Sequence, residues 1–172
     1  MVAKYEVMPK VALVSLGGAG TSVMREVVKT NLDVDMYNVN SKRSLKNVKY
    51  YGFEEIELLA DELKNYDTVV LTAGLGSTGG DAVVKLYHLL NTVRRVCFLI
   101  SPFYFEVERL MKSRTQLSKI MSDGFEGAVL TLNSLLREMD DTEPSKTKLE
   151  KLIRNFDRNV AGLIVEMMEE IE

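Results

Sequence analysis

Residues 67–81 read DTVVLTAGLGSTGGD, an apolar run followed directly by a glycine-rich turn. Four glycines and two hydroxyl residues stand where a buried strand ends and a helix is predicted to begin: Gly74, Gly76, Ser77, Thr78, Gly79 and Gly80. Glycine accepts positive φ and lets backbone amides approach a ligand closely. The first amides of a helix lack intrahelical partners and carry partial positive charge. The stretch therefore predicts a backbone site for an anion such as phosphate, with a tight turn that binds nothing as the alternative.

The whole chain has the composition of a single globular domain. Its 172 residues carry a formal net charge of −3, and 27% of them are charged. These values leave no basic footprint of the kind that nucleic-acid binding needs. No apolar run approaches the roughly 18 residues of a membrane span, and the first ten residues are not typical of a signal peptide. We therefore expect a cytoplasmic protein with no membrane span and no nucleic-acid partner.

The sequence offers neither a metal cage nor a catalytic triad. It holds one histidine, His88, and one cysteine, Cys97, which together cannot form a His/Cys metal site. Cys97 lies in the apolar run VCFLI, so we expect a buried thiol without a disulfide partner. His88 falls in a helical stretch, which favours a packed or surface side chain over a catalytic one. We predict no catalytic residue and no protein-bound metal.

Strand-like and helix-like segments alternate along the chain. Short apolar runs predict strands at 10–16, 34–40, 47–51, 67–73, 95–101 and 127–133. Helical periodicity predicts helices at 21–32, 53–66, 81–93 and 104–124. Alternation with short connections is typical of an α/β fold, a three-layer Rossmann-like parallel sheet with helices on both faces.

The last segment differs from this alternation. Residues 140–146 are the most linker-like stretch, and residues 147–171 then predict one long terminal helix. Its apolar stripe comprises Leu149, Leu152, Ile153, Phe156, Val160, Leu163, Ile164, Met167 and Ile171. We expect this helix to lie on the sheet, so that residues 1–172 form one domain.

Several ligand-binding residue types are predicted to meet at the carboxyl ends of the strands, where ligands bind such sheets. They are the turn 17–22 (GGAGTS), Asn38 and Asn40, the turn 74–81, residues 102–106 and Asn133. Amides suit phosphates, the Glu106 carboxylate suits ribose hydroxyls, and side-chain amides suit a base. The GGAGTS turn lacks the GxGxxG spacing, and no GK[ST] sequence follows it, so neither a dinucleotide fingerprint nor a Walker loop is present. The set predicts a nucleotide site of another kind.

These segments resemble the FtsZ/tubulin family, especially archaeal-type FtsZ with a GGAG core. KVALVSLGGAGTSVMREV (10–27) resembles the first strand, glycine loop and helix, and YNVNSKRSL (37–45) resembles the NTDxQxL turn. DTVVLTAGLGSTGGDAVV (67–84) resembles the segment around the GGGTGTG signature loop. LISPFYFEVERLMKS (99–113) resembles the PFxFEGxxRM segment, and TLNSLL (131–136) the PNDxLL turn. The terminal helix resembles the central helix of the family.

The chain also departs from the family pattern. The signature loop is shortened to GSTGG, Asn40 replaces the acid of NTD, and Arg109 stands one place before the arginine of FExxxR. The γ-phosphate-sensing loop after the second helix has no counterpart. FtsZ continues beyond its central helix into an acidic catalytic loop and a second domain, whereas this sequence ends at Glu172. The resemblance therefore implies binding of GDP or GTP, with Mg²⁺ accompanying GTP, and little hydrolysis by this chain alone.

The resemblance also implies roles for individual residues. Phosphate would be held by Gly17, Gly18, Ala19, Gly20, Thr21 and Ser22 together with Gly74, Gly76, Ser77, Thr78, Gly79 and Gly80. Glu106 would lie at the ribose, Asn133 at the ribose or base, and Asn155 or Asp157 at the base. Arg109, and Asn38 in the turn after the second strand, would also belong to the nucleotide site.

Three hypotheses fit the sequence. The first is a single-domain FtsZ relative that binds guanine nucleotide. The second is a degenerate pseudo-GTPase without nucleotide, acting as an interaction module that binds itself or caps a full-length FtsZ-like protein through its nucleotide face. The third is another nucleotide enzyme on a Rossmann-like sheet. The family connects the first two with cell division or cytoskeletal organisation, by analogy of fold alone.

Overall fold

Six parallel strands form one sheet in the computed structural model, which describes residues 8–138 and 146–171. They are β1 (Val11–Leu16), β2 (Asp35–Val39), β3 (Lys49–Tyr51), β4 (Thr68–Gly74), β5 (Arg94–Ser101) and β6 (Gly127–Thr131). The strand order is β3-β2-β1-β4-β5-β6, and every neighbouring pair is parallel. This is the order of doubly wound nucleotide-binding sheets. The predicted Rossmann-like α/β architecture is confirmed.

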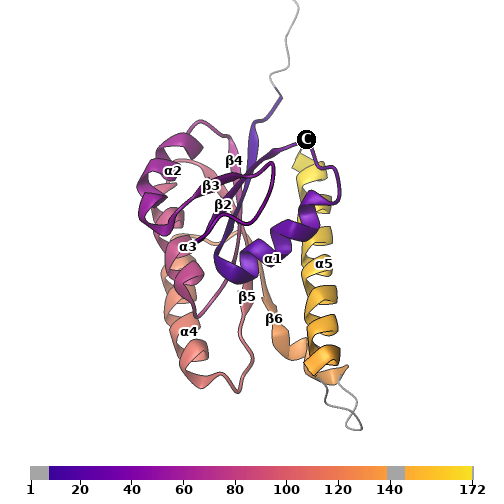
Figure 1. Ribbon diagram of the computed structural model, residues 1–172. Coiled ribbons are helices and arrows are strands. Elements are labelled where there is room, and N and C mark those ends of the chain that lie inside the picture. The colour runs from indigo at the N-terminus through magenta and orange to yellow at the C-terminus, as the bar shows by residue number, and fades with distance from the viewer. Residues whose placement is uncertain (1–7, 139–145, 172) are drawn as a thin grey trace, which may run out of the picture.

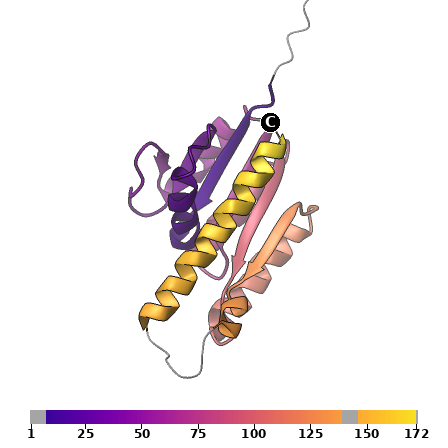
Figure 2. The same cartoon turned by 90° about the vertical axis from the view of Figure 1, so that its right-hand side faces the viewer.

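Helices cover both faces of this sheet. They are α1 (Gly17–Val28), α2 (Ile56–Leu63), α3 (Thr78–Leu89), α4 (Val107–Met121) and α5 (Lys146–Ile171). Short 3₁₀ turns, η1 (Phe53–Glu55) and η2 (Leu132–Arg137), precede α2 and follow β6. Helices α1 and α5 lie on one face, and α2, α3 and α4 lie on the other (Figure 1). The second view shows α5 running along the outside of the molecule (Figure 2).

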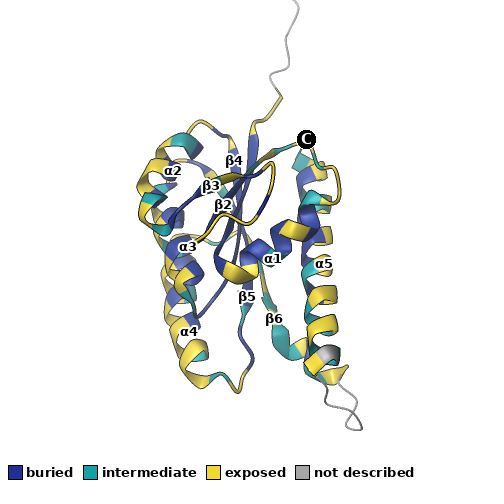
Figure 3. Ribbon diagram, viewed as in Figure 1, coloured by how far each residue is buried: buried dark blue, intermediate teal, exposed yellow. Residues whose placement is uncertain are grey.

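The alternation of side chains along β1 divides the core into two halves. Ala12, Val14 and Leu16 pack towards α2 and α3, whereas Val11 and Leu13 pack towards α1 and α5. All residues of β1 and β4 are buried, as expected of central parallel strands covered on both faces. Figure 3 shows this buried centre between two half-exposed helical layers.

Two helices begin earlier than the sequence predicts. Helix α1 begins at Gly17 instead of Thr21, and α3 begins at Thr78 instead of Asp81. Gly17 has a φ of 76°, which turns the chain out of β1 within one residue. The GGAG run is therefore the first turn of a helix and not a loop before it.

The terminal helix lies against α1 and the sheet, as predicted. It begins at Lys146; residues 140–145 of the predicted linker lie outside the described residues. Phe156, Val160, Ile164 and Met168 are buried, but Leu163 of the predicted stripe is 44% exposed. Leu163 lies about 100° around the helix from the buried Ile164. The face of α5 that packs inward is therefore narrower than the predicted apolar stripe.

The expected burial of Cys97 is confirmed, and His88 takes one of the two positions expected for it, the surface. Cys97 is buried in β5, and this burial raises the pKa of its thiol to about 12. His88 lies on the surface, with its Nδ1 2.8 Å from Asp123 Oδ2. None of the helices in the described part of the chain is both long and apolar enough to cross a membrane.

A cluster of tyrosines fixes β2 and the chain before β4 to α2. The hydroxyls of Tyr37 and Tyr66 lie 2.7 Å apart, and Tyr66 donates to Asp35 Oδ2 at 2.5 Å. Tyr37 and Tyr51 donate hydrogen bonds to the Glu62 carboxylate, which also pairs with Lys49 at 2.6 Å. Burial is the main cause of the raised pKa of Tyr37 and of the pKa of about 12 at Tyr66.

The tyrosine cluster should make the protein sensitive to alkali. Because the pKa of Tyr66 is raised from 10.0 to about 12 by folding, its stabilisation is complete below pH 10 and is lost as the pH rises through 12. We expect the melting temperature to fall over this window, in step with tyrosinate absorbance near about 295 nm. Tyr66→Phe should flatten the fall. Tyr104→Phe is the matched control, since Tyr104 is 62% exposed. Equal profiles for both variants would contradict a role for the cluster.

Candidate functional site

Two helices begin side by side at the centre of the sheet. Helix α1 follows β1 on one face and α3 follows β4 on the other, and β1 and β4 are neighbours. In doubly wound sheets, ligands bind in the crevice at such a switch point. Leu16 and Ser77 precede α1 and α3, and neither helix has a side-chain N-cap. The first amides of both helices are therefore free to bind an anion.

Glycines bring these two helix starts into contact. A Cβ on Gly79 would lie 2.8 Å from the Leu16 carbonyl oxygen and 2.9 Å from Gly17 Cα. A Cβ on Gly20 would lie 2.6 Å from the Thr72 carbonyl oxygen. These glycines therefore allow the starts of α1 and α3, and α1 and β4, to pack backbone against backbone. Gly18 differs, because no atom lies within 4 Å of a Cβ placed there, and it faces open space.

A cavity of about 170 Å³, here called the glycine cavity, lies at this junction. It is lined by Gly18, Ala19, Gly74, Leu75, Ser77, Ile100, Pro102, Glu106, Arg109 and Leu132. Six of these residues were predicted from the sequence as ligand-binding. The cavity combines two helix N-termini with one carboxylate and one guanidinium.

Glu106 and Arg109 form an ion pair at the mouth of the glycine cavity. Arg109 Nη1 lies 2.9 Å from Glu106 Oε1, and Glu106 Oε2 accepts a hydrogen bond from the Phe103 amide at 3.0 Å. Arg109 is exposed while Glu106 is half-buried, so the guanidinium can turn towards an anion without leaving the surface. If the Arg109 guanidinium turns away, the Glu106 carboxylate still accepts the hydrogen bond from the Phe103 amide.

Gln116 on α4 holds the loop that leads into α3. Its Oε1 accepts from the Gly76 amide at 2.7 Å, and its Nε2 donates to Asp81 Oδ1 at 2.9 Å and to the Ser77 carbonyl at 3.2 Å. The Gly76 amide was predicted to bind phosphate, but it is already paired. The sequence analysis missed Gln116. A glutamine among the inward-facing positions of an amphipathic helix could have indicated a side chain with internal hydrogen-bond partners.

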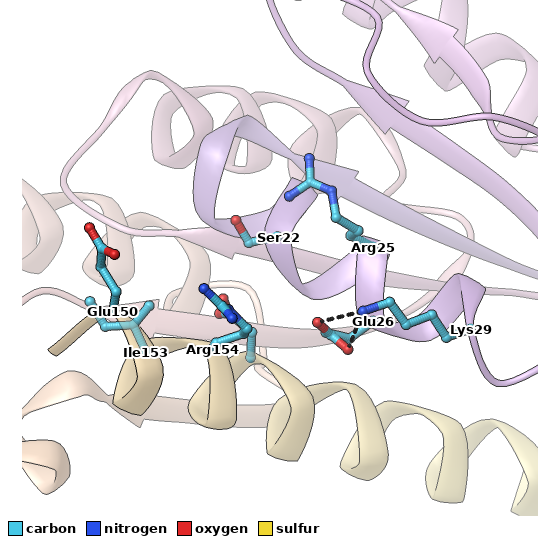
Figure 4. A pocket seen from close by; sticks show the side chains of 8 residues that line it. Ser22, Arg25, Glu26, Lys29, Glu150, Ile153 and Arg154 are labelled. Carbon is cyan, nitrogen blue, oxygen red and sulfur yellow. Dashed lines mark hydrogen bonds and ion pairs between the residues drawn. The ribbon is translucent and has the colours of Figure 1, made fainter. Parts of the chain in front are cut away.

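A larger cavity of about 510 Å³, the α1–α5 cavity, adjoins the first along α1. It is lined by Ser22, Arg25, Glu26, Lys29, Glu150, Ile153, Arg154 and Asp157. In Figure 4 the Glu26 carboxylate of α1 points towards α5, whereas the Arg25 guanidinium points away from it. Ser22 donates to the Gly18 carbonyl at 3.1 Å and lies one turn, roughly 6 Å, further along α1. The two cavities therefore follow one face of α1.

The charges in the α1–α5 cavity are unequally paired. Glu26 is only 8% exposed, and Lys29 and Arg158 lie 3.1 and 3.8 Å from its carboxylate. Asp157 takes part in none of the ion pairs or hydrogen bonds found among the described residues. Burial, and then the nearby Glu26, raise the pKa of Asp157 to about 6, although Arg25 opposes this shift. Asp157 is thus a carboxylate without a partner, in a cavity large enough for a base.

Some predicted residues lie behind the cavities. Asn38 is 1% exposed and donates to Ser15 Oγ at 2.8 Å and Thr21 Oγ1 at 2.9 Å. Thr21 in turn donates to the Gly17 carbonyl at 2.6 Å. Neither side chain can reach a bound molecule in this arrangement, because both are buried between α1 and β2. They position α1 instead.

The remaining predicted residues lie at the margins. Asn133 Oδ1 accepts from the Tyr104 amide at 2.9 Å and so braces the loop after β5. Asn155 is exposed and lines neither cavity, which leaves Asp157 as the member of that pair that faces ligand space. Thr78 is exposed at the start of α3, and the backbones of Gly17, Gly20, Gly76, Gly79 and Gly80 are buried.

Sequence reasoning missed most of the α1–α5 cavity. Arg25, Glu26, Lys29 and Arg154 appear in the sequence as ordinary surface charges of two helices. Their meeting depends on how α1 and α5 are rotated against each other, which periodicity alone does not give. Within residues 8–138 and 146–171, no group of three or more His, Cys, Asp or Glu side chains could hold a metal ion.

Comparison with known proteins shows sequence similarity to an archaeal protein. An uncharacterized protein of Archaeoglobus fulgidus is 65% identical over 164 residues, which cover 95% of this chain and 96% of the relative. No protein-family model matches the chain.

Solved structures of two other proteins are distantly similar to the chain. A flavodoxin-like domain from Synechococcus has 11% identity and a TM-score of 0.41 over 91% of this chain and 99% of that domain. Homoserine dehydrogenase from S. aureus has 13% identity and a TM-score of 0.39 over 72% of this chain and 33% of the enzyme. Neither carries an argument about function.

The packing of the two helix starts predicts opposite effects for two glycines. Gly79→Val should lower the melting temperature strongly, because its side chain meets the Leu16 carbonyl and Gly17; on the sequence alone we would expect lost binding with little loss of stability. Gly18→Ala should leave the melting temperature unchanged or slightly raised, since alanine favours a helix by about 0.5–1 kcal/mol. Thermal melts followed by circular dichroism measure both. A stable Gly79→Val variant would contradict the packing described here.

Proposed function

We propose that this chain, which belongs to one family with the Archaeoglobus fulgidus protein, binds a guanine nucleotide as a single-domain relative of FtsZ and tubulin. The observation that carries the proposal is the adjacency of the two cavities along α1. Free helix amides suitable for phosphate open onto the glycine cavity, and a partnerless carboxylate suitable for guanine, Asp157, faces the next cavity.

The phosphates would lie in the glycine cavity. The amides of Gly18 and Ala19 begin α1, and those of Thr78 and its neighbours begin α3, so two partial positive charges converge there. Arg109 supplies a full charge at the mouth. No lysine or arginine lies within the turns 17–22 or 74–81, so the backbone is the main ligand.

The base would lie in the α1–α5 cavity. Guanine presents two neighbouring N–H donors on its Watson–Crick edge and an acceptor at O6. An ionised Asp157 accepts from both donors, and Arg25 or Arg154 can donate to O6. Adenine presents an acceptor where guanine has the ring N–H, so it would leave Asp157 unpaired. The cost of leaving the Asp157 carboxylate without a donor contributes more to the discrimination against adenine than the bonds to guanine do.

The ribose would span the turn of α1 between the cavities. Its hydroxyls then come near the Glu106 carboxylate, which still has acceptor capacity beside Arg109 and Phe103. Glu106 supplies the carboxylate among the residues that line the glycine cavity, and in this structure it pairs with Arg109. The residues present suit a diphosphate, and Mg²⁺ accompanying GTP would be held mainly by the phosphates.

The hypothesis of an interaction module without nucleotide has one specific observation in its favour. The Gly76 amide is bonded to Gln116, and the glycines of both turns are accounted for by packing. Titration with nucleotides decides between the two hypotheses, since a pseudo-GTPase would bind none of them.

Direct titration should give a clear order of nucleotides. We expect fluorescent GDP to bind, GTP to bind with similar affinity, and ADP and NAD to bind at least about tenfold more weakly, the scale of one lost charged hydrogen bond. Asp157→Asn should remove most of the preference for guanine. Asn155→Ala is the matched control, because Asn155 lies on the same helix outside the cavity. Equal affinity for GDP and ADP would refute the assignment of the base site.

Asp157 should also set opposing pH effects on stability and binding. Its folded-state pKa of about 6 exceeds the 3.8 of a free aspartate, so its contribution to stability is complete below pH 3.8 and is lost as the pH rises through 6. Asp157→Asn should therefore raise the melting temperature at pH 7 by a few degrees, the scale of about 1 kcal/mol. Affinity for GDP should fall below pH 6 in the parent and vary little with pH in the variant. A purely structural Asp157 would give a destabilised variant instead.

A further inference from the structure

Helix α5 carries its charges in the order that its own dipole disfavours. Residues 146–158 hold five basic and two acidic side chains, whereas residues 159–171 hold three acidic side chains and no basic one. The N-terminus of a helix is its positive end, so cations there and anions at the C-terminus each cost about 0.3–1 kcal/mol. Two of these basic side chains pair with acids of the same chain: Lys146 with Glu150 and Arg158 with Glu26.

The middle of the outer face of α5 holds a glycine without a role in the isolated chain. Gly162 is exposed, and no atom lies within 4 Å of a Cβ placed on it. Glycine inside a helix costs about 1 kcal/mol relative to alanine. Leu163 beside it is 44% exposed. A small residue next to an exposed leucine is what a close helix–helix contact needs.

The charge pattern is complementary to itself in the antiparallel direction. Lys151 and Glu169 are equally far from residue 160, and because they are five helical turns apart they lie on the same side of the helix, near Gly162. Both residues are exposed, and Figure 2 shows α5 running uncovered along the outside of the molecule. A second α5 laid antiparallel about residue 160 would place Lys151 of each copy opposite Glu169 of the other and bring Gly162 close to the axis. A parallel copy would place base opposite base.

We propose that two copies of this chain associate through the outer face of α5, with the two helices antiparallel around residue 160. Two-fold symmetric dimers are the commonest assembly of soluble proteins, and their interface is the same patch on both subunits. The interface does not depend on the proposed nucleotide, because its centre lies on the side of α5 away from the sheet. Pairing of opposite charges between the two copies of α5 offsets the unfavourable interaction of these charges with the helix dipole.

A charge exchange tests the pairing. Sedimentation equilibrium of the full chain should give a dimer whose dissociation constant rises with salt. Lys151→Glu and Glu169→Lys should each weaken the dimer at least tenfold, because each places like charges together at two symmetric points. The double variant should restore the dimer. Lys46→Glu, the same charge change on an exposed residue far from α5, is the control and should have no effect.

Cross-linking tests the direction of the helices. At 1.5 Å per residue, two copies of residue 159 would lie roughly 3 Å apart along the axis, and two copies of residue 151 roughly 27 Å apart. Asn159→Cys should therefore cross-link with a short bis-maleimide and Lys151→Cys should not, while the buried Cys97 stays unreactive. A chain that stays monomeric at about 100 µM in low salt overturns the proposal, as do equal cross-linking at both positions and single exchanges without effect.

Discussion

The contact between the starts of α1 and α3 is the constraint on which the candidate site depends. Gly17 and Gly79 meet backbone to backbone, and Gly20 lies directly on the Thr72 carbonyl of β4. Any side chain at these points would push the two helices apart. Because they stay together, two positive helix ends open onto one cavity of about 170 Å³. The packing of the two helices and the anion binding that we propose would thus both depend on the same glycines.

The fold could be predicted from the sequence because its signals are local. Buried parallel strands appear as apolar runs, and DTVVLTA and RVCFLIS lie within a residue or two of the observed β4 and β5. The helix starts were placed too late, because Gly17 turns the chain within a single residue. The larger cavity could not be predicted, since it depends on the rotation of α5 against α1. The family resemblance identified Asp157 and Asn155 as candidates, and only the packing of α5 separates them.

Two features of the molecule oppose its stability, and both point to binding. Asp157 is held without a partner, near Glu26, where its ionised form is disfavoured. Helix α5 has its charges in the order that its dipole disfavours and a glycine at the centre of its outer face. Unfavourable contributions of this kind to the free energy of folding are typical of functional surfaces, where the binding of a ligand or a partner offsets them. By contrast, the tyrosine cluster around Tyr37 satisfies its hydroxyls internally and is expected to serve stability alone.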